Sequence, residues 1–337
     1  MEWLTQDKKI AVTGGAGLIG SNLCNTLHRK GYKVLAIDNF EKGKREYLDP
    51  GIEVRKVDLR YLYPNSGLFH GCDTVIHLAS KVGGIGYYLK NAYEVMKDNI
   101  LIDSNTLECA ISNRVHKYLY ASSAHIYPKS LQTSRDPVSI EEDQDLPADP
   151  GLSYGWAKMV GEKQLMYASK EGKIKSAIAR YVGVYGETQS YELDTGSVIP
   201  VMCHRAVKYP DIPFTLWGDG KETRTYCYVQ DAIDATMRML GKLEDPSRHT
   251  MFALNIGNNS FNYSIDDIAK KIIKISGKDI PINYDESRQA VIQGQRCSVS
   301  NAYQQLDWCA TTNLDEGLKK IYKDVEKRLQ STSQENS

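Results

Sequence analysis

Short apolar runs alternate with longer helical patterns over the first half of the chain. Strands are predicted at residues 8–15, 33–40, 52–59, 73–80 and 116–123, with helices between them at 17–30 and 92–113. The runs hold apolar or β-branched residues in succession, without the alternation of a strand that has one wet face, so they are typical of buried parallel strands. Regular alternation of such strands with helices predicts an α/β fold built on a doubly wound parallel sheet with right-handed crossovers.

The second half begins with an amphipathic helical pattern at 153–171 and a strand-like run at 176–186, after which the elements become shorter. Further helices are predicted at 197–208, 229–241, 264–276 and 314–329, and further strands at 214–218 and 251–257. We therefore divide the chain into a first domain over residues 1–186 and a smaller C-terminal α/β lobe over residues 187–330, some of whose elements return to the first sheet. Residues 331–337 are expected to form a disordered tail.

Charge and cysteine content exclude several classes of protein. The 337 residues carry 42 Lys plus Arg and 42 Asp plus Glu, so the chain has no general attraction for nucleic acid. No apolar run approaches the roughly 18 residues of a membrane helix, and the N-terminal sequence lacks the apolar core of a signal peptide. The cysteines are scattered without a CxxC pair, which predicts neither a metal site nor a disulfide framework. We expect a cytoplasmic protein that binds no nucleic acid, no membrane and no metal ion.

The strongest local signal is the sequence VTGGAGLIG, which ends the first predicted strand and opens the first predicted helix. Gly14 permits a tight turn, Gly17 lets the backbone approach a pyrophosphate, and Gly20 lets helix and strand pack closely. The start of the helix adds free N–H groups and the positive end of the helix dipole. This arrangement predicts a dinucleotide site in a Rossmann-type domain. A purely structural glycine turn is the alternative.

Residues at the ends of the next strands fit the same cofactor. Asp38 ends the second strand, where a carboxylate accepts hydrogen bonds from the ribose hydroxyls of NAD and repels the 2′-phosphate of NADP. NADP stays an alternative because basic residues follow closely, namely Lys42, Lys44 and Arg45. Asp58 and Leu59 end the third strand, where an adenine would lie, and residues 77–80 end the fourth strand beside the expected pyrophosphate.

Tyr154 and Lys158 stand four residues apart near the start of a predicted helix, in the sequence YGWAK. Residues at i and i+4 share one helical face, so the phenol and the ammonium point the same way. A nearby ammonium and a positive nicotinamide would lower the tyrosine pKa and let the phenolate take a proton from a sugar hydroxyl as hydride leaves. Ser122 and Ser123 end the fifth strand and add hydroxyl groups to the same region. An interfacial tyrosine beside a surface lysine is the simpler alternative.

Together these motifs resemble the extended short-chain dehydrogenase/reductase family, which includes the nucleotide-sugar epimerases and dehydratases. The resemblance covers about residues 8–325 and rests on TGGAGLIG, Asp38, HLAS, SSAHIYP, YGWAK, ARYVGVYG, WGDGKETRTYCYVQDA and QLDW. It implies an NAD-dependent enzyme that acts on a nucleotide-diphosphate sugar held by the C-terminal lobe. It also implies a homodimer in which the helices at 92–113 and 153–171 pack against their copies.

The resemblance also implies roles for individual residues. Ser123, Tyr154 and Lys158 would form the catalytic triad, with Ser123 and Tyr154 beside the C4 hydroxyl of the substrate. The implied cofactor contacts are Gly14, Gly17, Leu18, Ile19, Gly20, Asp38, Asp58, Leu59, Leu78, Ala79, Lys81, Asn99, Tyr154, Lys158 and Tyr181. The implied substrate contacts are Ser122, Ser123, Tyr88, Ser197, Trp217, Arg224 and Arg296, with Arg288 as a weaker candidate. An arginine fork matches two phosphate oxygens, so the arginines would grip the diphosphate.

The loop KVGGIGYY and the sequence SSAHIYPK are most similar to the subgroup of GDP-fucose synthase and GDP-mannose 3,5-epimerase. Those enzymes place a cysteine where this chain has His125, and a lysine or histidine where it has Ser197. A serine hydroxyl is too weak an acid or base at pH 7 to serve without help, so Ser197 does not supply the second acid/base group of that subgroup's two-base mechanism. His125 is a candidate catalytic acid or base because the ordinary pKa of an imidazole lies near working pH.

Epimerisation at C4 needs only hydride transfer and the Ser, Tyr and Lys groups, and it is the first prediction for this chain. Epimerisation at C3 or C5 through His125 is the second. A 4,6-dehydratase, or a reductase of a 4-keto sugar, is the third, because the Asp-Glu pair of the dehydratases is replaced by Ala124-His125. Gly183 and Glu187 also stand where the family usually has Asn and Pro. A dinucleotide-binding regulator without catalytic activity is the alternative from another class.

Overall fold

A seven-stranded sheet forms the centre of the molecule, and its neighbouring strands all pair in parallel. The computed structural model describes residues 8–245, 251–288 and 291–335. The strands are β1 (Lys9–Thr13), β2 (Lys33–Asp38), β3 (Glu53–Lys56), β4 (Cys72–His77), β5 (Lys117–Ser123), β6 (Lys175–Tyr181) and β11 (Met251–Ile256). Their order is β11-β6-β5-β4-β1-β2-β3, which reverses between β1 and β4. The predicted doubly wound α/β sheet is therefore confirmed.

Helices cover both faces of this sheet. α1 (Leu18–Arg29) packs with α6 (Val229–Leu243) on one face, and α3 (Ala92–Ser112) packs with α4 (Ser153–Lys170) on the other. Alternate residues of β1 reach the two cores, because Ile10 and Val12 pack towards α1 and α6 whereas Ala11 packs towards α3 and α4. Both faces of the central strands are buried, which explains why their sequences lack polar alternation.

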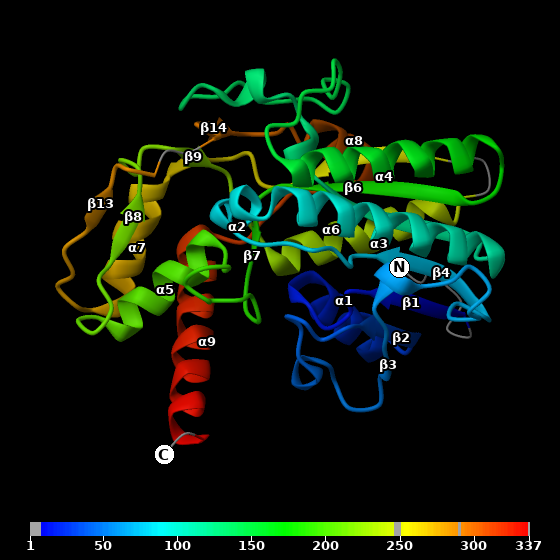
Figure 1. Cartoon of the computed structure of the whole chain (residues 1–337), viewed down its shortest axis with the longest axis horizontal. Helices are drawn as coiled ribbons and strands as arrows, with labels where there is room; N and C mark the ends of the chain where they lie inside the picture. The colour runs from blue at the N-terminus through cyan, green and yellow to red at the C-terminus, as the bar shows by residue number, and fades with distance from the viewer. Residues whose placement is uncertain (1–7, 246–250, 289–290, 336–337) are drawn as a thin grey trace.

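A smaller group of elements from the second half lies at one side of the sheet (Figure 1). Its helices α5 (Val198–Lys208), α7 (Ile265–Ser276) and α9 (Leu314–Glu335) pack on one another. Its strands form small sheets: β8 (Thr215–Trp217) with β13 (Asn283–Asp285), β9 (Thr223–Arg224) between β12 (Tyr263–Ser264) and β14 (Gly294–Gln295), and β7 (Val184–Tyr185) with β10 (Cys227–Tyr228). β11 comes from the same half of the chain but joins the large sheet beside β6.

α7 agrees with the helix predicted at 264–276: it begins after Ser264, whose side chain forms a capping box with Asp267, and it ends before Gly277 in left-handed backbone. Several other elements differ from the prediction. α9 continues to Glu335, past the predicted end near residue 329 and into the stretch expected to be a disordered tail. Unpredicted short helices are α2 (Ile85–Lys90), α8 (Ser300–Leu306) and the 3₁₀ turns η1 (Arg45–Tyr47), η2 (Leu59–Tyr61), η3 (Ala124–Ile126) and η4 (Lys129–Gln132). Elements this short show no hydrophobic period.

Residue types that can form disulfides or bind metal ions do not cluster in the described part of the fold. All seven cysteines are free thiols, and six of them are buried. In the ranges given above, no group of three or more His, Cys, Asp or Glu side chains is arranged to hold a metal ion. No helix among the described residues has the length and apolar character needed to span a membrane.

Candidate active site

The glycine turn after β1 lies where the strand order reverses, between β1 and β4. Gly14 adopts left-handed backbone with φ of 64°, and a side-chain carbon there would lie 2.7 Å from the backbone nitrogen of Ala79. A side chain at Gly20 would collide with the carbonyl of Gly14, so α1 lies close against the turn. Gly17 precedes α1, and the first N–H groups of a helix have no partner within it. The turn forms a bare backbone cradle that fits the pyrophosphate of a dinucleotide.

Asp38 at the end of β2 supports this turn from the neighbouring strand. Its Oδ2 accepts the N–H of Ala16 at 3.0 Å, and its Oδ1 accepts the N–H of Phe40 at 2.8 Å. Each carboxylate oxygen can accept a further hydrogen bond, such as a ribose hydroxyl donates. The basic residues that favoured NADP have other partners: Lys42 donates to the carbonyl of Val82, Lys44 pairs with Glu46, and Arg45 donates to the carbonyl of Leu48. These pairings favour a cofactor without a 2′-phosphate.

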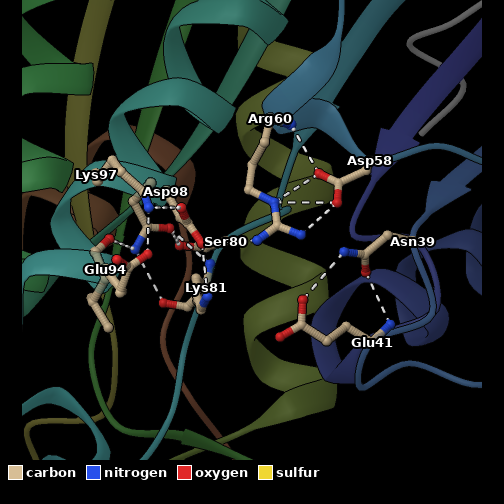
Figure 2. A network of polar contacts seen from close by, with 11 residues as sticks. Asn39, Glu41, Asp58, Arg60, Ser80, Lys81, Glu94, Lys97 and Asp98 are labelled. Atoms are coloured by element: carbon tan, nitrogen blue, oxygen red, sulfur yellow. Dashed lines mark hydrogen bonds and ion pairs between the residues drawn. The ribbon is translucent and has the colours of Figure 1, made fainter. Parts of the chain in front are cut away.

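Figure 2 shows an ion network at the ends of β3 and β4. Arg60 donates to both oxygens of Asp58, at 2.9 and 2.5 Å, and to Oδ2 of Asp98 on α3 at 2.9 Å. Lys81 donates to the same Asp98 oxygen at 2.7 Å. The hydrogen bonds from Arg60 hold the pKa of Asp58 below its ordinary value. Asp58 and Lys81 are predicted from the sequence, whereas no motif reveals Arg60 and Asp98, which bind them.

Asn99 is fully buried, and its side-chain amide is fully engaged. Its Oδ1 accepts the hydroxyl of Ser80 at 2.7 Å and the N–H of Lys81 at 2.8 Å. Its Nδ2 donates to the carbonyls of Lys81 at 3.1 Å and Val95 at 2.8 Å. Asn99 therefore holds the backbone after β4 in place, beside the glycine turn.

The other predicted cofactor residues fall into two groups. Those at the glycine cradle are Leu18, Ile19, Leu78 and Ala79. Leu59 and Tyr181 have buried side chains, and the hydroxyl of Tyr181 lies 2.6 Å from Oγ1 of Thr236 on α6. The structure brings the first group to the cradle and directs the side chains of the second into the core.

Tyr154 lies at the start of α4 within a cluster of rings. Its ring stacks on that of Tyr88 from α2, with centres 5.0 Å apart and planes 8° from parallel. The imidazole of His125 meets both rings edge-on, with its centre 5.9 Å from that of Tyr154 and 6.2 Å from that of Tyr88. The structure thus brings together three residues that the sequence places in separate motifs.

The protein's own groups around Tyr154 shift its pKa in both directions. Burial raises the pKa of the phenol, and nearby Tyr88 and Asp103 raise it further. Hydrogen bonds with the side chains of Ser80 and Ser123 act in the opposite direction. In the protein by itself, the phenol is therefore kept protonated.

Lys158, one turn along α4, is buried and faces an aspartate that the sequence analysis does not single out. Its Nζ lies 3.5 Å from Oδ1 of Asp103 on α3 and 4.7 Å from the centre of the Tyr120 ring on β5. Burial lowers the pKa of Lys158, and the charges of Asp103 and Glu162 oppose that effect. The lysine thus depends on neighbouring carboxylates to keep its charge.

Ser122, Ser123 and His125 follow one another at the end of β5. Oγ of Ser123 accepts the N–H of His125 at 3.2 Å and begins η3. Oγ of Ser122 and Nδ1 of His125 are buried and have no hydrogen-bond partner among the described residues. Burial lowers the pKa of His125 to about 4, and the charge of Arg224 acts in the same direction. The imidazole is therefore neutral at pH 7, with one unpaired ring nitrogen.

Arg224 reaches towards the same cluster from β9. Its guanidinium donates to the carbonyls of Thr223 at 2.7 Å and Ile292 at 2.9 Å. Ile292 belongs to the same buried apolar cluster as Tyr88 and Tyr154, so the bond to its carbonyl brings the guanidinium to the ring cluster. The charge of Arg224 lowers the pKa of His125. The structure therefore links this predicted phosphate contact to the predicted catalytic residues.

Arg296 has a different setting. It donates to the carbonyl of Asn259 at 2.9 Å, and its Nε is buried without a partner in the part of the chain that the structure describes. Arg296 follows the end of β14, and its guanidinium binds a different backbone segment from the carbonyls of Thr223 and Ile292 that hold Arg224. The two predicted phosphate clamps therefore have different partners in the protein alone.

Trp217 joins the C-terminal lobe to the glycine-rich segment around α2. A side chain at Gly86 would collide with its indole, and the Arg288 guanidinium lies over its ring at 4.5 Å. The N–H of Gly84 donates to the loop before α5 at 3.2 Å. Ser197 is the N-cap residue of α5 but makes no side-chain capping bond. These contacts bring the predicted substrate residues Trp217 and Ser197 close to α2, which carries Tyr88.

Gly183 and Glu187 depart from the family pattern for visible reasons. Gly183 has φ of 58°, and a side chain there would collide with the carbonyl of Thr225. Glu187 accepts the hydroxyl of Tyr228 at 2.8 and 2.7 Å. Both departures serve the contact between the end of β6 and β10.

Comparisons with known proteins agree on one family. The profile of the NAD dependent epimerase/dehydratase family matches residues 10–257. GDP-mannose 3,5-epimerase of Arabidopsis thaliana is 27% identical over 339 residues, which cover 99% of this chain and 86% of that protein. A putative UDP-glucose 4-epimerase of Methanocaldococcus jannaschii is 28% identical, over 93% of this chain and 96% of that protein.

Solved structures give the same picture. The UDP-glucose 4-epimerase of Thermotoga maritima, solved with UDP-glucose, superposes with a TM-score of 0.84 at 25% identity and covers 95% of this chain and 99% of its own. The UDP-glucuronic acid 4-epimerase of Bacillus cereus, solved with UDP-glucuronic acid and NAD, gives a TM-score of 0.81 at 27% identity, with coverage of 95% and 99%. Relatives with different reactions lie at similar identity, so similarity alone does not select a reaction.

Proposed function

The chain belongs to the NAD dependent epimerase/dehydratase family, and we propose that it is a nucleotide-sugar epimerase that works through a transient 4-keto intermediate, most simply at C4. The observation that carries this proposal is the convergence of Ser123, Tyr154 and Lys158 near the glycine cradle, at the carboxyl ends of the parallel strands. Ligands of doubly wound sheets bind at this edge, where the strand order reverses.

Each residue of the triad has a distinct task in this proposal. When bound, NAD supplies a hydride acceptor and a positive charge beside the site. Oη of Tyr154 takes the proton of the C4 hydroxyl and later returns it, while Ser123 orients that hydroxyl. The ammonium of Lys158 favours the phenolate, which burial alone disfavours. The stacked ring of Tyr88 covers one face of the phenol and limits access of water.

Epimerisation at C4 asks for no further acid or base. The ketone turns over in the site, and the hydride returns to its other face, so no proton leaves a ring carbon. The other polar groups of the site fit a reaction without a second acid or base, because Ser197 is a weak acid and base and His125 is neutral at pH 7. The NAD-bound relative from Bacillus cereus is itself a 4-epimerase, which supports the choice.

A second candidate is epimerisation at C3 or C5 through His125. The observation in its favour is the unpaired, buried Nδ1 of an imidazole that touches the rings of Tyr154 and Tyr88. A neutral imidazole can accept a proton from a carbon made acidic by a neighbouring ketone. The similarity to a GDP-mannose 3,5-epimerase also supports this reaction.

We also propose how the substrate is held. Arg224 would bind the diphosphate, because its guanidinium lies near the ring cluster and its two backbone bonds fix its position. Trp217 is partly exposed and would offer its ring as a wall for the nucleotide base. Arg296, whose Nε has no partner among the described residues, is a second candidate for the same diphosphate.

A homodimer through α3 and α4 is the proposed assembly. The two helices pack on each other, and their outer surfaces expose apolar side chains, namely Tyr93, Met96, Leu101, Trp156 and Tyr167. Exposed apolar side chains on two neighbouring helices favour an interface.

The proposed reaction is tested by incubating the NAD-loaded enzyme with a panel of nucleotide sugars in heavy water and following the products by NMR. A C4 epimerase should invert C4 without deuterium from the solvent entering the ring. Deuterium at C3 or C5 would select the second candidate instead. A 4-keto-6-deoxy product, or no turnover of any sugar while NAD stays bound, would contradict both.

A further inference from the structure

Three polar side chains form a row across the middle of the large sheet. Thr13 of β1 is in register with His77 of β4, and His77 is in register with Tyr120 of β5. All three are fully or almost fully buried, which is unusual for polar groups in the centre of a parallel sheet. Residues in register point to the same face, which here is the face covered by α3 and α4.

Asp103 of α3 is the centre of this buried group. Its Oδ1 lies 2.9 Å from Nε2 of His77, and its Oδ2 accepts the hydroxyl of Tyr120 at 2.5 Å. The ammonium of Lys158 lies 3.5 Å from Oδ1 and over the ring of Tyr120. Three elements thus direct donors at one carboxylate.

Gly161 makes room for this arrangement on α4. A side-chain carbon there would collide with the hydroxyl of Tyr120 and would lie 3.0 Å from Oδ2 of Asp103. Any larger residue would therefore push the carboxylate or the phenol away from the helix that carries Lys158. The absence of a side chain at this position fits a close, specific contact.

The hydrogen-bond chain continues from Asp103 to the dinucleotide turn. An ionised carboxylate only accepts, so Nε2 of His77 donates to it, and Nδ1 is left to accept the hydroxyl of Thr13 at 2.7 Å. Oγ1 of Thr13 in turn accepts the N–H of Ala79 at 3.3 Å, and Ala79 lies against Gly14. Lys158 is thereby connected with the backbone that cradles the cofactor.

The charges of the group are balanced only if Lys158 is protonated. Burial alone would raise the pKa of Asp103, but Lys158, His77 and Tyr120 outweigh it and hold that pKa below its ordinary value. Burial keeps the imidazole of His77 neutral, since it lowers the pKa of that ring. Glu162, the other carboxylate that acts on Lys158, is bound by Arg180 at 3.0 and 2.8 Å. Of these two carboxylates, Asp103 is therefore the one without another cationic partner of its own, and it forms the ion pair with Lys158.

We propose that Asp103 is a positioning residue for Lys158, which holds the ammonium charged and in place inside a dry site and ties it through His77 and Thr13 to the dinucleotide turn. This inference rests on the proposed function, in which Lys158 must carry its charge beside Tyr154. The titratable groups that face the pair among the described residues are His77 from β4, Tyr118 and Tyr120 from β5, and Glu162 and Tyr154 from α4.

The sign of the effect can be worked out for the neutral variant Asp103→Asn. The negative charge raises the pKa of both Lys158 and Tyr154, so its removal moves both ionisations to lower pH. Activity needs a protonated lysine and an ionisable phenol, so both limbs of the pH profile should move together. At a separation of this size we expect a shift of about one to three pH units towards acid. A residue with only a structural role would lower the profile without moving it.

The test compares pH profiles of kcat for the NAD-loaded wild type, Asp103→Asn and a matched control, Asp98→Asn, with NAD content and thermal unfolding measured for each. Asp98 lies on the same helix and is equally buried, but it binds Arg60 and Lys81. The acid shift should appear for Asp103→Asn and be absent for Asp98→Asn. An unmoved profile in a folded, NAD-loaded Asp103→Asn protein would overturn the positioning role while leaving the proposed function intact.

A second measurement needs neither a folded variant at position 103 nor catalytic turnover. The NAD-loaded wild type is labelled with ¹³C-lysine, and the Cε signal of Lys158 is assigned by its loss in Lys158→Arg. The proposal predicts an ammonium shift for Lys158 that persists to at least pH 8. An amine shift at pH 7 would overturn it, whether or not any nucleotide sugar is turned over.

Discussion

Two aspartates of α3, Asp98 and Asp103, are both buried, yet their surroundings differ. The cations that bind Asp98 remain partly in solvent, because the side chains of Arg60 and Lys81 are 23% and 18% exposed. The cation that faces Asp103 does not, because the side chain of Lys158 is 1% exposed. Water screens the charges around Asp98, so that network acts mainly on stability. The charges around Asp103 are screened less, so they act strongly on the protonation of their neighbours. Access of water decides which role a buried carboxylate takes.

The largest expected effect is on turnover, when the hydroxyl of Tyr154 beside the buried Lys158 and Asp103 pair is removed. Tyr154→Phe keeps the ring that stacks on Tyr88 and removes only the hydroxyl, so turnover should fall by about 10²–10⁴-fold. NAD content and thermal unfolding should stay close to those of the wild type. Tyr303→Phe, on the exposed face of α8, serves as the control and should leave turnover unchanged. Undiminished turnover in Tyr154→Phe would remove the phenol from the mechanism.

The network around Asp98, which is partly exposed to solvent, should affect the stability of the fold instead. Asp98→Asn leaves Arg60 and Lys81 without their shared anion, so the free energy of unfolding should fall by about 1–3 kcal/mol. Denaturant unfolding at pH 7 measures this difference. A loss below a few tenths of a kcal/mol would show that the network is energetically neutral.

The same network gives a pH dependence whose sign follows from the pKa of Asp98. Burial alone would raise that pKa, but Lys81 and Arg60 outweigh it and hold it below the value in the unfolded chain. The stabilisation is therefore complete above the unfolded pKa of about 3.9 and is lost as the pH falls through the folded one. The stability difference between wild type and Asp98→Asn should shrink between about pH 5 and pH 3. A difference that stays constant over this range would contradict the assignment.

The smallest effect is expected at His125, whose Nδ1 is buried but which, unlike the two aspartates, pairs with no oppositely charged side chain among the described residues. His125→Asn should change C4 epimerisation by no more than about threefold, because that reaction needs no second base. Steady-state turnover of the best substrate in the panel measures it. A loss of about 10²-fold, together with loss of solvent deuterium at C3 or C5, would favour the second candidate reaction.

Much of the fold follows from the sequence, because the long elements bury one or both faces and show it in their pattern. The strands of the large sheet, the covering helices and the return of β11 depend on such runs. β8 lies within the strand predicted at 214–218, but the two-residue strands β9, β12 and β14 around Arg224 are too short to carry any period. They form only because distant segments meet. α9 runs past its predicted end because polar composition alone does not stop a helix.

The candidate site is predictable only where its residues lie in contiguous motifs. The glycine turn, Asp38 and the pair Tyr154 and Lys158 are of this kind, and the structure places them around one edge of the sheet. Asp103 carries no motif, because its role comes from contacts with three other elements. Spacing reveals the lysine beside Tyr154 but neither the burial nor the aspartate, which raise the pKa of the phenol in the protein by itself. The predicted lowering also depends on a positive nicotinamide and stays a prediction.

The central claim, that hydride leaves and returns at C4 while Tyr154 moves the proton, is tested most directly with a nucleotide sugar deuterated at C4. The NAD-loaded enzyme is incubated with this substrate in ordinary water, and the epimerised product is examined by NMR and mass spectrometry. The label should remain at C4 of the inverted product, because the same deuteride returns from the cofactor. Loss of the label to solvent, or inversion at another carbon with C4 untouched, would contradict the account.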